Sequence, residues 1–228
     1  MNLKEKLVEI CSNIKAAQER SGLDHPVDIV GVTKTHPFSY IEESYRAGLR
    51  SIGENRVQEA EKKFRSFEKM PQLKKRFIGH LQYNKVKRCV ELFDTIDSLD
   101  SLKTIRKISR HAREMKKEVS VLIEVNTSKE TQKKGFSLSQ KEDIAECFVE
   151  EGVSVDGLMT IGPNTSNQDE IRQSFRALKE LGSWLLEKKK VEVIHLSMGM
   201  SGDYEIAVEE GSTMIRVGSL LYGSRNNG

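Results

Sequence analysis

The amino-acid sequence predicts an α/β protein: a single-domain (β/α)8 barrel of the TIM type with an extra N-terminal helix. Short apolar runs alternate with amphipathic segments along the chain, and this alternation requires a parallel sheet. The runs number eight, the count at which such a sheet closes into a barrel. An open doubly wound sheet is the structural alternative. It would be favoured by a GxGxxG turn after the first strand, where this chain has GVTKTHP instead.

Length and composition fit one globular domain. The chain has 228 residues, 37% hydrophobic and 31% charged, and its net charge of +3 is too small to favour a nucleic-acid partner. Cys11, Cys89 and Cys147 are scattered, which favours reduced thiols and a cytoplasmic location. No signal peptide is recognisable, and no apolar run approaches the roughly 18 residues of a membrane span. We therefore expect no membrane partner, and a monomer or weak dimer.

The first element is predicted to be a helix that ends at Gly22. Asn2 can cap it, with Glu5 three residues later in the pattern of a capping box. Its apolar residues recur at helical spacing and predict one buried face: Leu3, Leu7, Ile10, Ile14 and Ala17.

Eight strands and several intervening helices follow in order. The strands are expected at residues 27–33, 50–54, 76–81, 94–99, 119–126, 155–162, 192–199 and 213–219. Helices are expected among them at residues 39–49, 101–117, 139–152 and 168–189. The last helix carries one apolar stripe: Ile171, Phe175, Leu178, Leu181 and Leu185. Since no linker interrupts the series, residues 1–228 are expected to form one domain.

Polar residues gather where the predicted strands end. The functional residues of a barrel of this kind lie at the C-terminal ends of its strands and in the loops that follow. Most of these ends carry a polar group: Lys34, Glu54, Asn55, His80, Asp97, Ser98, Glu124, Asn126, Thr160, Ser197, Arg216 and Ser219, with Met198 beside Ser197 and Gly218 beside Ser219.

Lys34 is an unusual way to end an apolar strand. Removing an ammonium group from water costs several kcal/mol unless something compensates. Partial desolvation and nearby cations lower the pKa of an amine, which frees it to attack a carbonyl carbon. Lys34 is therefore a candidate for forming a Schiff base.

The loops after the seventh and eighth strands predict a phosphate site. They read LSMGMSGD and RVGSLLYG, with Ser201, Gly218 and Ser219 as candidate contacts and a helix expected near Asp203. These two loops often bind phosphate in barrels, although either alone could be an ordinary turn. A phosphate site opposite a lysine favours a phosphorylated carbonyl compound.

Arg216 ends the eighth strand beside the second of these loops. It could face the ring nitrogen of pyridoxal phosphate, where a permanent cation would keep that nitrogen unprotonated and weaken the ring as an electron sink. An ion pair with Glu54 or Glu124 at the barrel mouth is the alternative.

Several segments together resemble the pyridoxal-phosphate (PLP) homeostasis protein family, whose members are single-domain barrels similar to the N-terminal domain of bacterial alanine racemase. The segments are VGVTKTHP, IGENRVQEA, FIGHLQYNK, IEVNTSKETQKKGF, GLMTIGP and LSMGMSGDYEIAVEEGSTMIRVGSLLYGSR. The resemblance implies that Lys34 holds pyridoxal 5'-phosphate as a Schiff base. It implies that Arg216 meets the pyridine nitrogen, and that the remaining cofactor-binding residues are Asn55, His80, Ser197, Met198, Ser201, Gly218 and Ser219.

The function that this resemblance implies is PLP homeostasis, with PLP-dependent apoenzymes as recipients of the cofactor. Two alternatives stay open. One is a PLP-dependent amino-acid racemase or lyase, which needs a second base such as Tyr83 or His80. The other is a cofactor-free Schiff-base aldolase. Lys133 or Lys134 could bind a second ligand that is anionic. The spacing of the histidines does not match that of metal ligands.

Overall fold

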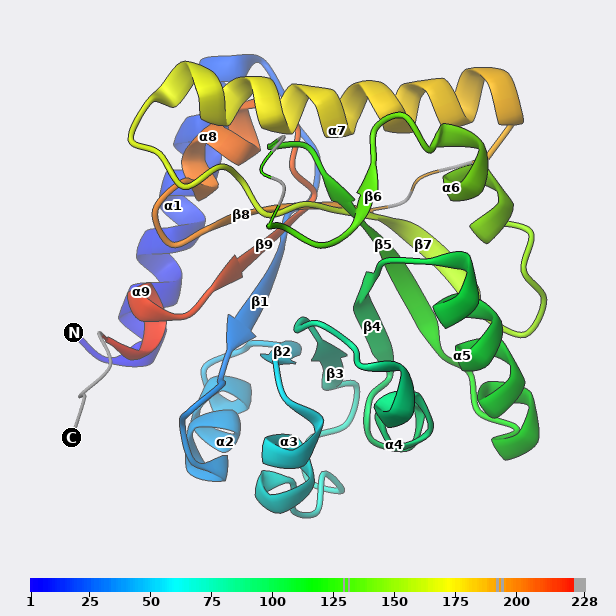
Figure 1. Ribbon diagram of the computed structural model, residues 1–228. Helices are drawn as coiled ribbons and strands as arrows, with labels where there is room; N and C mark the ends of the chain where they lie inside the picture. Colours follow the sequence, from blue (N-terminus) through cyan, green and yellow to red (C-terminus); the bar gives the residue numbers. More distant parts are fainter. Residues whose placement is uncertain (129, 131, 192, 194, 224–228) are drawn as a thin grey trace.

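A computed structural model describes residues 1–128, 130, 132–191, 193 and 195–223, and it contains a closed parallel barrel (Figure 1). The strands follow one another around the ring in the order β4-β3-β2-β1-β9-β8-β7-β5, and pairing of β4 with β5 closes it. Their bounds are β1 (Asp28–Val32), β2 (Ser51–Glu54), β3 (Lys74–Phe77), β4 (Thr95–Leu99), β5 (Ser120–Asn126), β7 (Ser154–Met159), β8 (His195–Met200) and β9 (Met214–Val217). The predicted barrel is confirmed.

A short strand, β6 (Phe136–Ser137), pairs with the end of β5 outside this ring. Helices surround the barrel and cover its outer face (Figure 1). They are α1 (Leu3–Ser21), α2 (Phe38–Arg46), α3 (Val57–Lys63), the 3₁₀ turn η1 (Tyr83–Lys85), α4 (Val86–Leu92), α5 (Leu102–Met115), α6 (Lys141–Cys147), α7 (Gln168–Lys189), α8 (Tyr204–Glu209) and α9 (Ser219–Tyr222). Within the described residues, no helix combines the length and apolarity that crossing a membrane would need.

The extra N-terminal helix forms as expected. Asn2 and Glu5 exchange both bonds of the capping box, each 2.9 Å long, and Gly22 ends the helix with φ of +67°. The apolar face of α1 packs in one cluster with Tyr204 and Val208 of α8 and with Leu221 of α9. The helix thus supports the two short helices that follow the loops after β8 and β9.

The core has an outer layer and an inner layer. The outer layer lies between the strands and the helices, and the stripe of α7 is buried in it as predicted. Inside the barrel, side chains of β1, β5, β7 and β9 form a small apolar cluster of Val30, Leu122, Met159 and Met214. The interior also holds a buried ion pair, in which Arg76 of β3 donates to Asp97 of β4 over 2.7 Å.

The bounds of the predicted strands differ from those in the structure by up to four residues, and the largest difference is at the end of β3. β3 ends at Phe77, whereas the sequence predicts a strand over 76–81. The chain crosses the backbone of Asn55 at Gly79, where a Cβ would lie 2.1 Å from the Asn55 carbonyl oxygen. His80 is therefore in a loop. The strand predicted at 192–199 begins at His195, and residues 192 and 194 lie outside the described chain.

Candidate functional site

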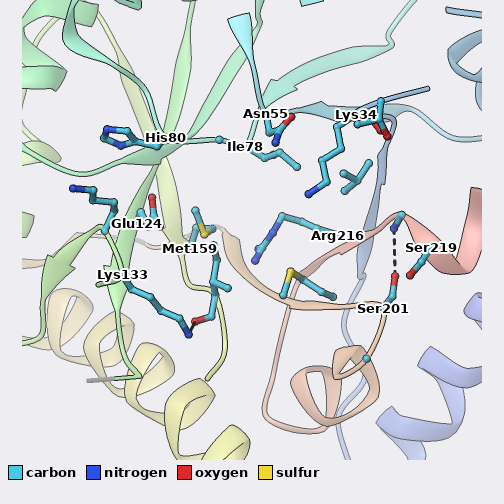
Figure 2. A pocket seen from close by; sticks show the side chains of 18 of the residues that line it. Lys34, Asn55, Ile78, His80, Glu124, Lys133, Met159, Ser201, Arg216 and Ser219 are labelled. Atoms are coloured by element: carbon cyan, nitrogen blue, oxygen red, sulfur yellow. Dashed lines mark hydrogen bonds between the residues drawn. The ribbon is translucent and has the colours of Figure 1, made fainter. Parts of the chain in front are cut away.

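A cavity of about 670 Å³ opens at the C-terminal ends of the strands (Figure 2). Its walls come from segments far apart in the sequence, because neighbouring strands of the ring bring their loops together. Seven of the nine cofactor-binding residues expected from the sequence line it: Lys34, Asn55, His80, Ser201, Arg216, Gly218 and Ser219. The end of the barrel predicted to be functional therefore contains a site of ligand size.

The turn after β1 holds Lys34 through a strained neighbour. Thr35 has φ of +68°, a left-handed conformation that β-branched residues rarely adopt. The Thr35 N–H donates to the Glu59 carboxylate over 2.6 Å, and the Thr35 hydroxyl donates to the Lys34 carbonyl over 2.5 Å. The Lys34 side chain extends from this fixed turn into the cavity (Figure 2).

A buried ion pair lies beneath the same turn. Glu54, fully buried at the end of β2, accepts hydrogen bonds from the Thr33 hydroxyl (2.6 Å) and from the Lys63 ammonium (2.7 Å). Lys63 also donates to the Thr33 carbonyl over 2.8 Å. Burial raises the pKa of Glu54, and the contact with Lys63 opposes that shift. Glu54 therefore ties β2, α3 and the end of β1 together.

Arg216 is held by three hydrogen bonds inside the barrel. One terminal nitrogen donates to the Ser197 carbonyl (2.9 Å) and hydroxyl (2.7 Å), and the other donates to the Thr160 carbonyl (2.7 Å). Burial lowers the pKa of Arg216, an effect that Asp97 and other carboxylates oppose, and a guanidinium keeps its charge in proteins. Within the described residues no ion pair joins it to Glu54 or Glu124, so the structure places a positioned cation at the cavity wall.

Ser197 and Met198, which the sequence analysis includes among the cofactor-binding residues, lie next to the cavity-lining residues in the chain but are not among them. Both are fully buried. Ser197 is turned toward Arg216 and fixes its guanidinium, whereas Met198 packs into the outer core. The two side chains differ in this way because successive side chains of β8 point to opposite faces of the strand.

The two loops expected to bind phosphate lie side by side. The Gly218 N–H donates to the Ser201 hydroxyl over 3.3 Å, a contact drawn as the dashed line in Figure 2. Ser219 begins α9 next to them. Gly199 has φ of +96°, and a Cβ there would lie 2.7 Å from that of Ala207, so this turn requires glycine. Hydroxyls and backbone amides thus converge on one corner of the cavity.

Asn55 and His80 line the cavity in different ways. The Asn55 side-chain oxygen is buried and has no hydrogen-bond partner in the described chain, so a ligand with a donor would satisfy it. The His80 side chain is 48% exposed, and its ring lies 3.4 Å from Asp100. Tyr83 is not a lining residue, and its ring packs under the Lys107 ammonium at 3.8 Å. Tyr83 is thus outside the cavity lining, whereas His80 belongs to it.

Glu124 is the cavity residue whose importance the sequence analysis missed. In the sequence it is only a strand end and a possible ion-pair partner, yet in the structure it lines the cavity and is 8% exposed. Burial raises the pKa of Glu124 to about 7, Asp100 adds to the shift, and Arg216 opposes it. The local signal was its place at the end of a strand.

Two lysines complete this part of the wall. The Lys133 ammonium donates to the Gly162 carbonyl over 2.7 Å and pairs with Glu130, so most of its capacity is used within the protein. Lys134 is exposed and also lines the cavity.

Comparison with known proteins identifies the family. The sequence model of the alanine racemase N-terminal domain matches residues 6–226. The pyridoxal phosphate homeostasis protein of Aquifex aeolicus is 40% identical over 227 residues, which cover 99% of each chain. The protein of that name from Escherichia coli is 31% identical over 231 residues, which cover 99% of this chain and 97% of its relative.

Solved structures agree. PipY of Synechococcus elongatus, solved with PLP bound, has a TM-score of 0.84 at 32% identity and covers 97% of this chain and 100% of its own. Alanine racemase of Clostridium difficile shares the fold, with a TM-score of 0.77 at 18% identity, over 99% of this chain and 60% of its own. The chain therefore belongs to the pyridoxal phosphate homeostasis protein family and has the fold of the alanine racemase N-terminal domain.

Proposed function

We propose that this protein binds pyridoxal 5'-phosphate, with Lys34 as the covalent anchor, and serves in the intracellular homeostasis of that cofactor. The observation that carries the proposal is the shared cavity of Lys34 and the paired loops of Ser201 and Gly218. The PipY structure with PLP bound and the names of the relatives support it.

The residues present fit the cofactor. Ser201, Gly218 and Ser219 offer hydroxyls and amides to a phosphate, and the buried oxygen of Asn55 lacks a donor that a ligand could supply. When bound, PLP supplies an aldehyde and an electron-accepting pyridine ring. Arg216 is the candidate neighbour of the ring nitrogen, which a permanent cation would keep unprotonated.

A carrier role is favoured over a racemase or lyase. Racemisation needs bases on both faces of the substrate carbon, and Lys34 can serve only one of them. Tyr83 lies outside the cavity lining, and His80 is half exposed. A cation beside the ring nitrogen would also make the ring a weak electron sink. The cofactor-free aldolase is less well supported, because the names of the relatives refer to pyridoxal phosphate.

We further propose that the cofactor passes to PLP-dependent apoenzymes in the cytoplasm. The three cysteines support a reducing compartment, since none forms a disulfide and two of them, Cys89 and Cys147, are buried. Burial raises the pKa of the Cys147 thiol to about 12, which keeps it protonated and unreactive.

Borohydride reduction of the protein incubated with PLP tests the anchor. We expect a pyridoxyl group on the peptide that contains Lys34, its loss in Lys34→Ala, and its retention in Lys133→Ala, which changes another lysine of the cavity wall. Mass spectrometry of the digest reads the result. An adduct found mainly on another lysine would contradict the assignment of Lys34 as the anchor. Turnover of an amino acid at about 1 per second or faster would instead establish an enzyme.

A further inference from the structure

Glu124 lies at the far side of the cavity from the proposed cofactor seat. Figure 2 draws Arg216 and Met159 between Glu124 on one side and Lys34, Ser201 and Ser219 on the other. All of them line the same cavity. A ligand at the Lys34 side would therefore leave the Glu124 side open.

Glu124 is only 8% exposed, and it lines the cavity. In the part of the chain that the structure describes, it receives no hydrogen bond and forms no ion pair within 4 Å. Its strongest charged influence is Asp100, which carries the same sign, and Arg216 acts on it more weakly. A buried carboxylate normally has a paired cation or hydrogen-bond donors, because removing it from water is costly. A cation that enters the cavity could therefore pair with this carboxylate, which Arg216 influences without forming an ion pair with it among the described residues.

Close packing prevents the carboxyl group from turning away. Gly135, with φ of +104°, packs so tightly on this residue that a Cβ there would lie 2.7 Å from the Glu124 carbonyl oxygen and 3.1 Å from its Cγ. The following residue, Val125, is fully buried in the outer core. The backbone and the first part of the side chain are therefore fixed, and the carboxyl group faces the cavity.

The surroundings favour an organic cation over a metal ion. No group of three or more metal-ligating side chains occurs among the described residues. The nearby walls include Met159, Ile161 and Ile78, which suit an alkyl chain. The Lys133 ammonium is already bound to Gly162 and Glu130, so an anionic ligand finds little free positive charge buried there.

We propose that Glu124 forms a second subsite of this cavity, which binds the ammonium group of a small primary amine while the apolar wall receives its carbon chain. Arg216 adjoins both the subsite and the cofactor seat, but amine binding is measured without cofactor, so its result is distinguishable from that of the proposed function. With both sides filled, the cavity would hold an amine next to the lysine that anchors the cofactor.

Titration of the protein with n-butylamine, without added cofactor, tests the subsite. Chemical shifts of the labelled Glu124 carboxyl carbon and of backbone amides are followed at pH 8. We expect saturable shifts at Glu124 and Met159, with affinity at least about tenfold lower in Glu124→Gln, which corresponds to about 1.4 kcal/mol. The matched control is Glu118→Gln, an exposed acid near the opposite end of the same strand, and it should bind as the wild type does.

Two ligands serve as controls that need no variant. n-Butanol has a similar chain without the charge, and butyrate has the opposite charge, and both should bind at least about tenfold more weakly than the amine. Equal affinity for the amine and the alcohol, tighter binding of butyrate, or an undiminished affinity in folded Glu124→Gln would each overturn the proposal. Adduct formation at Lys34 is measured separately, so either result leaves the other interpretable.

Discussion

Arg216 illustrates how single side chains set the properties of the cavity. Its guanidinium is held by the Ser197 hydroxyl and by two carbonyl groups, so its position does not depend on a ligand. Ser201 is the contrasting serine, because its hydroxyl lies at the cavity and accepts only a long bond from Gly218. One serine therefore serves the arginine and the other is available to a phosphate.

Replacing each serine by alanine should separate these roles. Ser197→Ala removes a hydrogen bond to a charged group and should lower the free energy of unfolding by about 1.5–3 kcal/mol. Ser201→Ala should change stability little but weaken binding of PLP, with much less effect on pyridoxal, which has no phosphate. Urea unfolding and equilibrium titration measure the two effects. The reverse pattern would show that the serines have been assigned the wrong way round.

Glu124 should make stability depend on pH. Its pKa is about 7 in the folded protein against a reference value of 4.5, so the folded state holds a proton that the unfolded state has lost between these values. Stability from this group is therefore present below about pH 4.5 and declines as the pH rises to 7. The difference between these two pKa values limits the change in the free energy of unfolding to about 3 kcal/mol at most.

Glu124→Gln, which is always neutral, should escape this loss. The free energy of unfolding of this variant should be close to that of the wild type at pH 4.5. At pH 8 it should be higher than that of the wild type, by at most about 3 kcal/mol. Urea unfolding at the two pH values provides the comparison. A stability difference that does not vary with pH would contradict the raised pKa of Glu124.

At the scale of elements, the turn after β1 is positioned by α3. Lys63 of this helix reaches both Glu54 and the Thr33 carbonyl, and Glu59 of the same helix accepts from Thr35. The residues on either side of Lys34 in the chain are therefore fixed by a neighbouring element. The geometry of the lysine depends on contacts that lie outside its own strand.

Lys63→Met should expose this dependence. It leaves the Glu54 carboxylate buried without its partner, a change that typically costs about 3–5 kcal/mol. Lys62→Met, an exposed neighbour on the same helix, should cost little. The double variant Glu54→Gln/Lys63→Met should recover part of the stability, and thermal unfolding would show it. Equal losses in the two single variants would argue against a buried ion pair.

The elements themselves were largely predictable from the sequence. Parallel strands covered on both faces appear as short apolar runs, so all eight were recognised, and the capped α1 and striped α7 were placed closely. The features that the sequence did not predict depend on contacts between residues far apart in the chain. The early end of β3 follows from the approach of Gly79 to Asn55, and the significance of Glu124 follows from its neighbours on other strands and loops. No local pattern contains that information.

At the scale of the molecule, the proposed cofactor seat joins the first and last strands of the ring. β1 pairs with β9, matching Asp28 with Met214 and Gly31 with Val217, so the Lys34 turn and the Gly218 loop become neighbours. Lys6 of α1 adds a bond of 2.7 Å to the Leu221 carbonyl of α9. The seat therefore belongs to the whole barrel.

Cofactor binding should accordingly stabilise the entire fold. A ligand that binds only the folded state adds about 2.7 kcal/mol to the free energy of unfolding at 100 times its dissociation constant. We expect PLP at that concentration to raise the free energy of unfolding by about 2.7 kcal/mol while unfolding remains a single transition. Circular dichroism in urea measures both. Lys34→Ala should show less stabilisation at the same concentration. Stabilisation of only part of the structure, seen as two separate transitions, would contradict this view.

The pairing of β1 with β9 also has a consequence during synthesis. The ribosome delivers β1 and the turn with Lys34 early and delivers β9 late, so a nascent chain carries the proposed anchor before it has the proposed cofactor seat. Until the barrel closes, we expect Lys34 to react with aldehydes no more selectively than the other lysines of the chain. Under the proposed function, capture of the cofactor therefore requires that β9 has been made and has paired with β1.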